Sequence, residues 1–488
     1  MKSRDSAKRN EPDLYRFWRN KVTCLIRSAK QNYFKKEISK NVGNTKEIWK
    51  ILKNVQSMNH DTNNEGPSIL RVDDKNITGN ANIVEMFNSF FTSVARSYTD
   101  TTHSNFDSSS IERHICPKIP PDETFEIPCI SENFVFKYLT TLDASKATGV
   151  DELSAKILKM SGPHIYASIT RIINISIRTN TFPSRWKVAK VIPIFKSNSR
   201  QDLSNYRPIS ILPVLSKILE KHVHIALTSF LKKFDLLEIA QSGFRSKHSC
   251  ETALLHVMEL WMEAIDKGQL TGAVLLDLRK AFDLVNHDIL IKKLKLYQFS
   301  SATIEWFKSY LMNRSQYVVM KGTASSCMNI SNGVPQGSIL GPLLFLIYIN
   351  DFSLCLTHCK ADMYADDTTF HISCSNVESL QSKLNFDAKN VSNWCKNNKM
   401  AINTSKTKSM LICSRQRYDN LRGQRNISVK MNDIVLENSD TEKLLGVRID
   451  AHLTWQAQID YICSTISTRL ALLRRIKQYL DTPTCNLY

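Results

Sequence analysis

The sequence predicts an α+β fold in which helices back an antiparallel sheet, and three observations support it. Residues 272–277 form a short apolar run that ends on Asp277, which is typical of a buried strand. Residues 363–370 pass from an apolar run through two adjacent acids to a β-branched run, which predicts a tight β-hairpin with the acids at its tip. Residues at helical spacing, most of them apolar, flank both strands: Leu254, Val257 and Trp261 on one side, and Leu380, Leu384, Phe386 or Asp387, Val391 and Trp394 on the other.

The adjacent acids, Asp366 and Asp367, predict a metal site. Two carboxylates this close repel each other, so the pair is costly unless a divalent cation lies between it and a further ligand. Asp277 is the expected further ligand. Two Mg²⁺ ions about 3.5 to 4 Å apart, with Mn²⁺ as an alternative, would activate a primer 3′-hydroxyl and steady the leaving pyrophosphate. The competing interpretation is a capped turn at Asp277 and a solvated acid pair.

The composition indicates a nucleic-acid-binding protein of several subdomains. A chain of 488 residues exceeds one hydrophobic core. Its formal charge of +19 and its pI near 9.3 favour a polyanionic partner. Residues 1–57 carry fifteen Lys or Arg against five acids, with aromatic residues between them. We expect this segment to be a basic helical linker that binds nucleic acid, or else an ordinary basic helix that packs its aromatic residues.

The cysteines and the apolar segments bear on the compartment. The twelve cysteines are scattered, and Cys355 and Cys359 flank His358 without a second ligand pair, so free thiols are expected rather than zinc. Reduced thiols suit the nucleus or the cytoplasm. The N-terminus is charged rather than apolar, and the longest apolar stretch, residues 339–349, is too short to cross a bilayer. We therefore expect an intracellular protein with no membrane partner.

The segment between residue 58 and the predicted hairpin contains three further predicted elements and a linker. Residues 58–130 are rich in polar residues and Pro, which predicts a linker around one short helix that buries Val84, Phe87, Phe91 and Val94. Next come a turn and a helix capped by Asp151 or Ser154, and a strand over residues 187–196. Residues 241–245 are expected to open the helix that contains Trp261.

Several motifs resemble those of a known family. Tyr364-Ala365-Asp366-Asp367 resembles the active-site box of reverse transcriptases, and Leu276 to Asp283 is similar to their first aspartate motif. The run from Gly333 to Asp351, which begins Gly333-Val334-Pro335-Gln336-Gly337, is similar to the template and nucleotide box of non-LTR (LINE-type, Jockey-like) retrotransposon reverse transcriptases. The likeness extends from about Thr148 to Asp450 in the family's order.

The resemblance implies a right-hand polymerase. Fingers and an antiparallel-sheet palm would occupy residues 131–450, with the core at about 176–450, and a partial thumb would begin at 451–488. Its last helix aligns Ile459, Ile462, Ile466, Leu470 and Leu473, with Arg469, Arg474, Arg475 and Lys477 among them. The implied reaction extends a DNA primer with dNTPs and uses RNA as the template. No endonuclease precedes this segment and no Cys/His knuckle follows it, so we expect a fragment or a decayed element.

The resemblance also implies roles for residues that bind the nucleotide. Arg207 and, more weakly, Lys196 would bind the triphosphate, and a surface ion pair is the alternative for both. Phe282 would clash with a 2′-hydroxyl and so select deoxynucleotides, which argues against an RNA-dependent RNA polymerase; core packing is its alternative. Gln336 offers a donor and an acceptor to the nascent pair or sugar. Asp283 would cap the next helix or order the site.

The remaining implied contacts are with the template, the primer and pyrophosphate. Gly333 and Gly337 would let backbone approach a base pair, and Gly446 would let backbone abut the primer end. Arg245 would contact template phosphate, or else be solvated or act as a cap. Lys406 would reach the triphosphate or protonate pyrophosphate, or else lie free on the surface. A rival to the enzyme is a catalytically inactive remnant that still binds nucleic acid.

Overall fold

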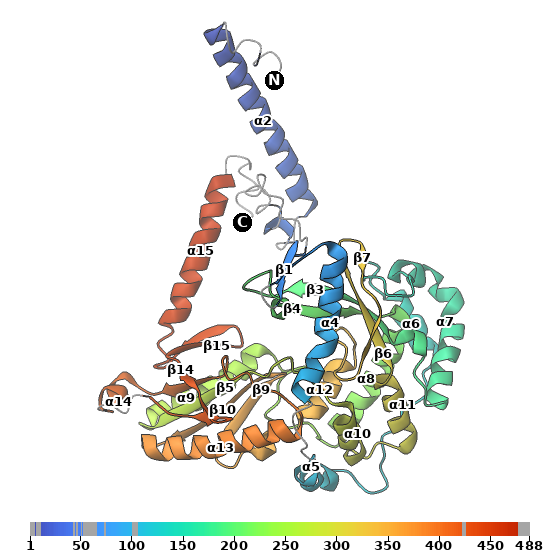
Figure 1. Cartoon of the computed structure of the whole chain (residues 1–488), viewed down its shortest axis with the longest axis vertical. Helices are drawn as coiled ribbons and strands as arrows, with labels where there is room; N and C mark the ends of the chain where they lie inside the picture. Colours follow the sequence, from blue (N-terminus) through green and yellow to red (C-terminus); the bar gives the residue numbers. More distant parts are fainter. Residues whose placement is uncertain are drawn as a thin grey trace. The chain divides into compact units, whose positions relative to one another are not determined.

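The computed structural model describes residues 5, 11–41, 44, 47–49, 51, 66–72, 75–99, 106–421 and 426–476, and of residues 94–99, 472–473 and 475–476 the backbone only. The chain divides into two compact units, one of residues 1–65 with 455–488 and one of residues 66–454 (Figure 1). All candidate site residues lie in the second unit.

The first unit contains two long helices. Helix α2 (Pro12–Lys40) buries Phe34 and Ile38 and leaves Phe17 and Tyr33 exposed. Helix α15 (Gln456–Ile476) presents an apolar row, Ile459, Ile462, Ile466 and Leu470, that is about half exposed. The helical periodicity expected here is therefore present, whereas the side chains of Leu473 and Arg475 and the whole of Lys477 lie outside the described residues.

A five-stranded sheet of the second unit carries the acids. Its strand order is β14-β11-β5-β10-β9, and all neighbours are antiparallel except β11 and β14. The central strand β5 is almost fully buried. The strands are β5 (Leu270–Leu276), β9 (Lys360–Tyr364), β10 (Asp367–Cys374), β11 (Lys408–Ile412) and β14 (Glu437–Asn438).

Helices cover both faces of this sheet. Helix α13 (Val377–Asn397) packs so closely on β5 that a Cβ at Gly272 would lie 2.4 Å from Leu384. On the other face, the His371 ring contacts Trp261 of helix α9 (Cys250–Asp266) edge-on. The alternation of side chains along β5 and β10 therefore sends apolar residues to two helices, which explains why the β5 sequence is continuously apolar.

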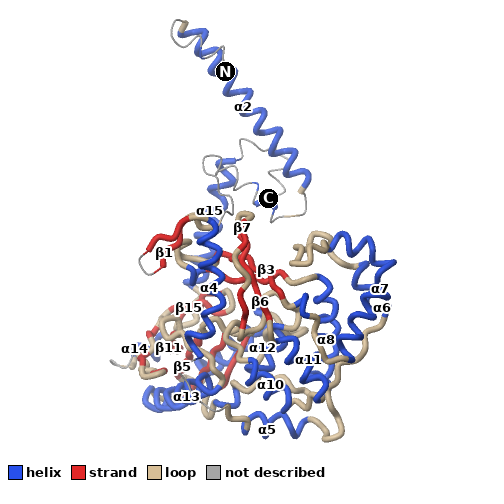
Figure 2. The backbone as a smooth tube through the Cα atoms, turned by 45° about the vertical axis from the view of Figure 1, so that its right-hand side comes forward, coloured by secondary structure: helices blue, strands red, loops and turns tan. Residues whose placement is uncertain are grey.

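A second sheet is covered by helix α4. Its order is β4-β3-β6-β7, with β8 also paired to β6: β3 (Val188–Phe195), β4 (Tyr206–Ile211), β6 (Arg314–Met320), β7 (Thr323–Ala324) and β8 (Met328–Ile330). Helix α4 (Asn80–Thr99) lies along β6 and β7 (Figures 1 and 2) and shares a core with the sheet. Val84 and Phe87 are fully buried in that core, as expected, and the Val94 side chain lies outside the description.

The expectation of a polar linker over residues 58–130 is wrong for its described part. These residues include the hairpin β1 (Ile69–Val72) and β2 (Lys75–Thr78), the 20-residue helix α4, and helix α5 (Ser109–Ile115). The polar composition misled because α4 places Asn, Ser and Thr between its apolar positions, which keeps the segment's average hydropathy low while one face is apolar.

The main core surrounds helix α12 (Gly341–Ile349), which is apolar on all sides and almost completely buried. Ser154 caps helix α7 (Ala155–Arg178) through the N–H of Ile157. The other elements are α6 (Glu132–Thr140), α8 (Val214–Lys233), α10 (His287–Leu296), α11 (Ser301–Leu311), α14 (Arg415–Asp419), β12 (Lys430–Met431), β13 (Ile434–Val435), β15 (Thr441–Leu444) and β16 (Val447–Asp450). Among the described helices, none has both the length and the apolar character needed to span a membrane.

Candidate active site

The acid pair lies at the tip of a two-residue hairpin, as predicted. Strands β9 and β10 pair Tyr364 with Asp367, which leaves Ala365 and Asp366 in the turn. Ala365 has a φ of +58° and is held by Gln241, whose Oε1 accepts the Ala365 N–H at 2.9 Å. Gly243 lies so near that a Cβ would be 2.2 Å from the Ala365 nitrogen. The loop of residues 241–245 therefore holds the hairpin turn in a backbone conformation that Ala365 adopts with strain.

This loop corrects one expectation. Residues 241–245 do not open a helix, because α9 begins at Cys250 behind a capping box made by Ser249 and Thr252. Arg245 donates from Nη1 to the carbonyls of Glu238 and Gln241 at 2.8 and 3.0 Å. Its guanidinium therefore caps the loop that braces the acid hairpin, which is the alternative that the sequence left open.

The register of the sheet brings Asp277 to the acid pair. Thr368 pairs with Leu276, so Asp277 follows directly opposite Asp367 at the same end of the sheet. The Asp277 carboxylate accepts a hydrogen bond from Asn403 Nδ2 at 2.7 Å, and the Asp277 N–H donates to Thr407 Oγ1 at 3.1 Å. The turn of residues 403–407 thus orients the third acid.

The three carboxylates repel one another, and two nearby cations partly offset this repulsion. Burial raises the pKa of Asp366, and the nearby Asp277 carboxylate raises it further. The pKa of Asp367 is also raised, first by burial and then by Asp366 and Asp277. Arg207 and Lys196 lower both pKa values. The structure therefore places these two exposed cations of the β3–β4 hairpin within electrostatic reach of the acids.

The donor set suits a hard divalent cation. Three carboxylates that repel one another offer the oxygen ligands that Mg²⁺ prefers. Within the described residues, however, no three His, Cys, Asp or Glu side chains converge closely enough to hold an ion. The chemistry of the acids fits such an ion, and the acids would have to draw together around it.

Phe282 and Gln336 lie on neighbouring segments. The Phe282 ring stacks on Phe345 of α12 with centroids 4.3 Å apart and meets Phe244 edge-on at 6.2 Å. Gln336 Nε2 donates to Asp283 at 2.8 Å, and burial raises the pKa of Asp283. Asp283 therefore holds the Gln336 side chain and does not cap α10, whose cap is Asn286.

Gly333 and Gly337, in the loop that contains Gln336, are required by the packing of the protein itself. Gly333 has a φ of +84°, and a Cβ there would lie 2.8 Å from the Asp283 carbonyl oxygen. A Cβ at Gly337 would lie 2.2 Å from the Ser210 carbonyl oxygen. Both glycines thus let the Gln336 loop pack on its neighbours, and their contact with a template stays a prediction.

The last two predicted residues lie on turns. Lys406 is exposed on the turn that holds Asp277. Gly446 and Leu445, with φ of +97° and +48°, form the two-residue turn of the β15–β16 hairpin. Open space surrounds the position of a Cβ at Gly446. Their contacts with nucleotide and primer stay predictions.

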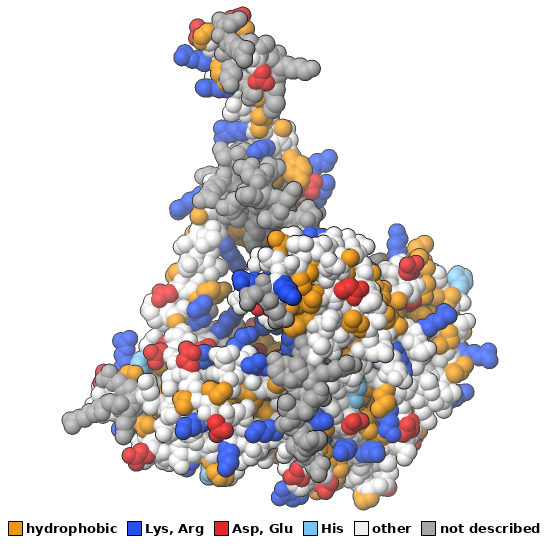
Figure 3. All heavy atoms as spheres, in the orientation of Figure 1, with side chains coloured by type: hydrophobic (Ala, Val, Ile, Leu, Met, Phe, Trp, Pro, Cys, Tyr) orange, Lys and Arg blue, Asp and Glu red, His pale blue; other side chains and the backbone are white. Residues whose placement is uncertain are grey.

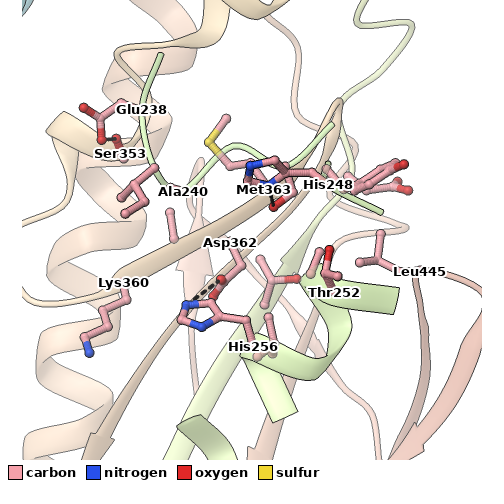
Figure 4. A pocket seen from close by; sticks show the side chains of 18 of the residues that line it. Glu238, Ala240, His248, Thr252, His256, Ser353, Lys360, Asp362, Met363 and Leu445 are labelled. Atoms are coloured by element: carbon pink, nitrogen blue, oxygen red, sulfur yellow. Dashed lines mark hydrogen bonds and ion pairs between the residues drawn. The ribbon is translucent and has the colours of Figure 1, made fainter. Parts of the chain in front are cut away.

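A cavity of about 620 Å³ lies beside the acid hairpin, between α9, β9 and the turn at Leu445 (Figure 4). Asp362 of β9 accepts a hydrogen bond from His371 Nε2 at 2.9 Å, and His256 points toward the same carboxylate at 3.8 Å. Asp362, Gln241 and Asn403 were missed in the sequence, because no local pattern sets them apart from other polar residues.

Comparison with known proteins agrees with this geometry. A family model described as reverse transcriptase (RNA-dependent DNA polymerase) matches residues 194–462, more than half of the chain. Three relatives come from Drosophila melanogaster: a probable RNA-directed DNA polymerase from transposon BS, the RNA-directed DNA polymerase from mobile element jockey, and a probable RNA-directed DNA polymerase from transposon X-element. They are 26%, 28% and 29% identical over 72%, 68% and 67% of this chain.

The matched segments cover only 39%, 36% and 36% of those three relatives, so this chain spans less than half of their length. The motifs, the fold around the acid hairpin and the family match agree. The chain belongs to the reverse transcriptase family, in its non-LTR retrotransposon branch.

Proposed function

We propose that this chain is an RNA-directed DNA polymerase that adds deoxynucleotides to a primer 3′-hydroxyl on an RNA template. One observation carries the proposal: the sheet register sets Asp277 opposite Asp367 and beside Asp366, at an edge that Arg207 and Lys196 also face. Three acids and two cations suit a substrate that is itself a metal-bound polyanion.

Each residue of the site then has a task. Asp277, Asp366 and Asp367 would hold two Mg²⁺ ions, with Mn²⁺ as a substitute, and the bound ions would make the primer hydroxyl a better nucleophile and neutralise pyrophosphate. Arg207 and Lys196 bind the triphosphate of the incoming dNTP. Lys406, which is exposed on the turn that binds Asp277, donates a proton to the leaving pyrophosphate.

Nucleotide selection falls to the neighbouring segments. The Phe282 ring, fixed by its stack on Phe345, excludes a 2′-hydroxyl by clash, which disfavours ribonucleotides and an RNA polymerase function. Asp283 engages the amide nitrogen of Gln336, which leaves the amide oxygen for the nascent pair or sugar. The Gly446 turn approaches the primer end.

The subdomains follow the same proposal. The sheet that carries the acids is the palm, the α4-covered sheet belongs to the fingers, and α15 begins a thumb. Helix α2 binds RNA template or RNA–DNA hybrid, because its basic residues alternate with exposed aromatic rings. Lys and Arg side chains are also spread over the face drawn in Figure 3. The unpaired cysteines of the described residues suit the nucleus or cytoplasm.

The test is incorporation of dATP on poly(rU) from an oligonucleotide primer, with and without Mg²⁺. We expect product from the wild type and a loss of at least about 100-fold in Asp366→Asn, since metal-ligand acids of this kind supply several kcal/mol. Asp288→Asn, which neutralises an exposed acid at the start of α10, is the matched control. Equal incorporation by wild type and Asp366→Asn would end the proposal.

A second candidate is a binding-only remnant, which the exposed basic and aromatic residues of α2 favour. Such a protein would bind RNA with a steep dependence on salt and would form no Mg²⁺-dependent product. The same assay therefore separates the two candidates.

A further inference from the structure

Helix α4 lies outside the residues that match the family model and is nonetheless firmly fixed on the second sheet. Phe87 is fully buried and meets Tyr206 edge-on with centroids 4.8 Å apart. Asn88 donates to the Ser326 carbonyl at 2.8 Å and accepts from Gln316 at 3.1 Å. Buried polar contacts of this kind define one orientation of the helix, so its next turn projects at a defined place.

That next turn reaches the first aspartate motif. The Lys280 ammonium lies 4.2 Å from the centroid of the Phe90 ring and 5.7 Å from that of Phe91. The ammonium is buried and has no hydrogen-bond partner among the described residues. Burial lowers the pKa of Lys280, while Asp283 and Asp202 raise it. A desolvated ammonium over an aromatic face gains more than an exposed one, so the two rings support the charge together with these carboxylates.

Lys280 also shapes the turn that bears Phe282. Its φ of +44° is rare for a residue with a side chain, and its carbonyl accepts the N–H groups of Asp283 and Leu284 at 2.9 and 3.1 Å. The Phe282 carbonyl in turn accepts the Val334 N–H at 3.0 Å. A strained backbone persists when its surroundings hold it, and here the Phe90 and Phe91 rings are part of them.

A second observation is independent of Lys280. Phe91 and Thr92 line a small cavity of about 50 Å³ together with Asp283, Ser210 and Gln336. Helix α4 therefore contacts Lys280 and also faces the cavity that Asp283 and Gln336 line. A helix that only covered the apolar sheet would need neither feature.

We propose that Phe90 and Phe91 are positioning residues for nucleotide selection: they hold the Lys280 ammonium and so fix the turn that presents Phe282 and, through Asp283, Gln336. The inference deepens the proposed function and rests on it. It makes a segment outside the family match a working part of the nucleotide site.

The test compares Phe90→Ala and Lys280→Met with Phe90→Trp, which keeps an aromatic face. We expect the first two to raise the KM for dNTP and to lower the preference for dNTP over rNTP by about 2- to 30-fold, the range for loss of a desolvated cation–π contact, with kcat changed less. Phe90→Trp should keep the wild-type KM for dNTP and the wild-type preference for dNTP over rNTP. The double variant should be no worse than either single variant, because both remove one contact.

Phe234→Ala is the matched control, because it removes a half-buried ring 4.7 Å from another lysine, Lys233, at the end of α8. It should keep wild-type selectivity. Wild-type KM and selectivity in Phe90→Ala and Lys280→Met would overturn the inference. So would a Phe90→Ala defect that Phe90→Trp shares, or an equal change in Phe234→Ala.

Hydrogen exchange gives a readout that does not need activity. In Phe90→Ala the amides of residues 279–285 should exchange faster than in the wild type, while those of β5 stay unchanged. Unaltered exchange at residues 279–285 would overturn the inference. A wild type that forms no DNA would instead refute the proposed function, and the exchange result would still decide whether α4 positions the turn.

Discussion

The charge of Asp366 and the strained turn beside it lower the stability of the folded protein. Its pKa is raised because burial and the Asp277 carboxylate disfavour its charge, and the turn beside it puts Ala365 at positive φ. Gln241 offsets part of this strain through its bonds to the Ala365 backbone. Unfavourable charge held by well-bonded neighbours is typical of a site selected for chemistry rather than for stability.

Neutralising this acid should therefore stabilise the metal-free protein. Asp366→Asn at neutral pH in EDTA is expected to raise the melting temperature by about 1 to 3 °C, as roughly 1 kcal/mol would in a large domain, while it abolishes polymerisation. Differential scanning calorimetry on both proteins measures the shift. Asp288→Asn removes an exposed acid of the first turn of α10 and should leave the melting temperature within about 1 °C. A lower melting temperature for Asp366→Asn contradicts the prediction.

Magnesium should raise the melting temperature of the wild type but not that of a variant that lacks one of the three acids. A cation that binds the folded acids and not the unfolded chain stabilises by mass action, by about 2.7 kcal/mol at a hundredfold excess over its Kd. Titrating MgCl₂ at constant ionic strength should raise the melting temperature of the wild type and of Asp288→Asn, and should leave Asp277→Asn nearly unchanged. The same rise in Asp277→Asn would show that the ion binds elsewhere.

Helix α13 links the sheet to the loop that enters the acid hairpin. The sequence left Phe386 or Asp387 as the buried position, and the structure buries Asp387 completely while Phe386 is half exposed. The Asp387 carboxylate accepts the N–H groups of Thr357, His358 and Cys359 at 2.9, 2.8 and 2.7 Å. An acid is buried here because it satisfies three amides just before β9 begins.

Loss of this acid should loosen the hairpin entry. Asp387→Ala leaves the three part-buried N–H groups without their acceptor and is expected to cost roughly 1 to 3 kcal/mol in urea unfolding, with Asp387→Asn costing less. Burial alone would raise the pKa of Asp387, yet the three amides lower it overall. Because the folded-state pKa lies below the unfolded one, the carboxylate's contribution is present above about pH 4 and is lost as pH falls through the folded pKa. A wild-type advantage over Asp387→Asn that grew on acidification would contradict this account.

Across the whole molecule, the sequence predicted elements whose signal is local. The apolar run before Asp277 and the hairpin at Asp366 agree with the structure because periodicity and turn chemistry encode them within ten residues or so. The partners of Asp277 and Ala365, Asn403 and Gln241, are more than a hundred residues away in sequence, and only the sheet register and the docked loop bring them in. Helix α4 was underestimated because its polar residues hide a face that only the second sheet explains.

The two cores give a last prediction, on the size of the folding unit. The second-sheet core joins Leu70, Ile83, Val84 and Phe87 to Val191 and Val318, and the main core includes α6 and α7. A chain of residues 184–454 keeps every strand of both sheets but exposes these surfaces, so it should aggregate or melt without a cooperative transition. Residues 66–454 should melt cooperatively, and calorimetry at matched concentration compares the two. Cooperative melting of the 184–454 chain near the temperature of the 66–454 chain would mean that residues 66–183 are not needed for the two sheets to fold.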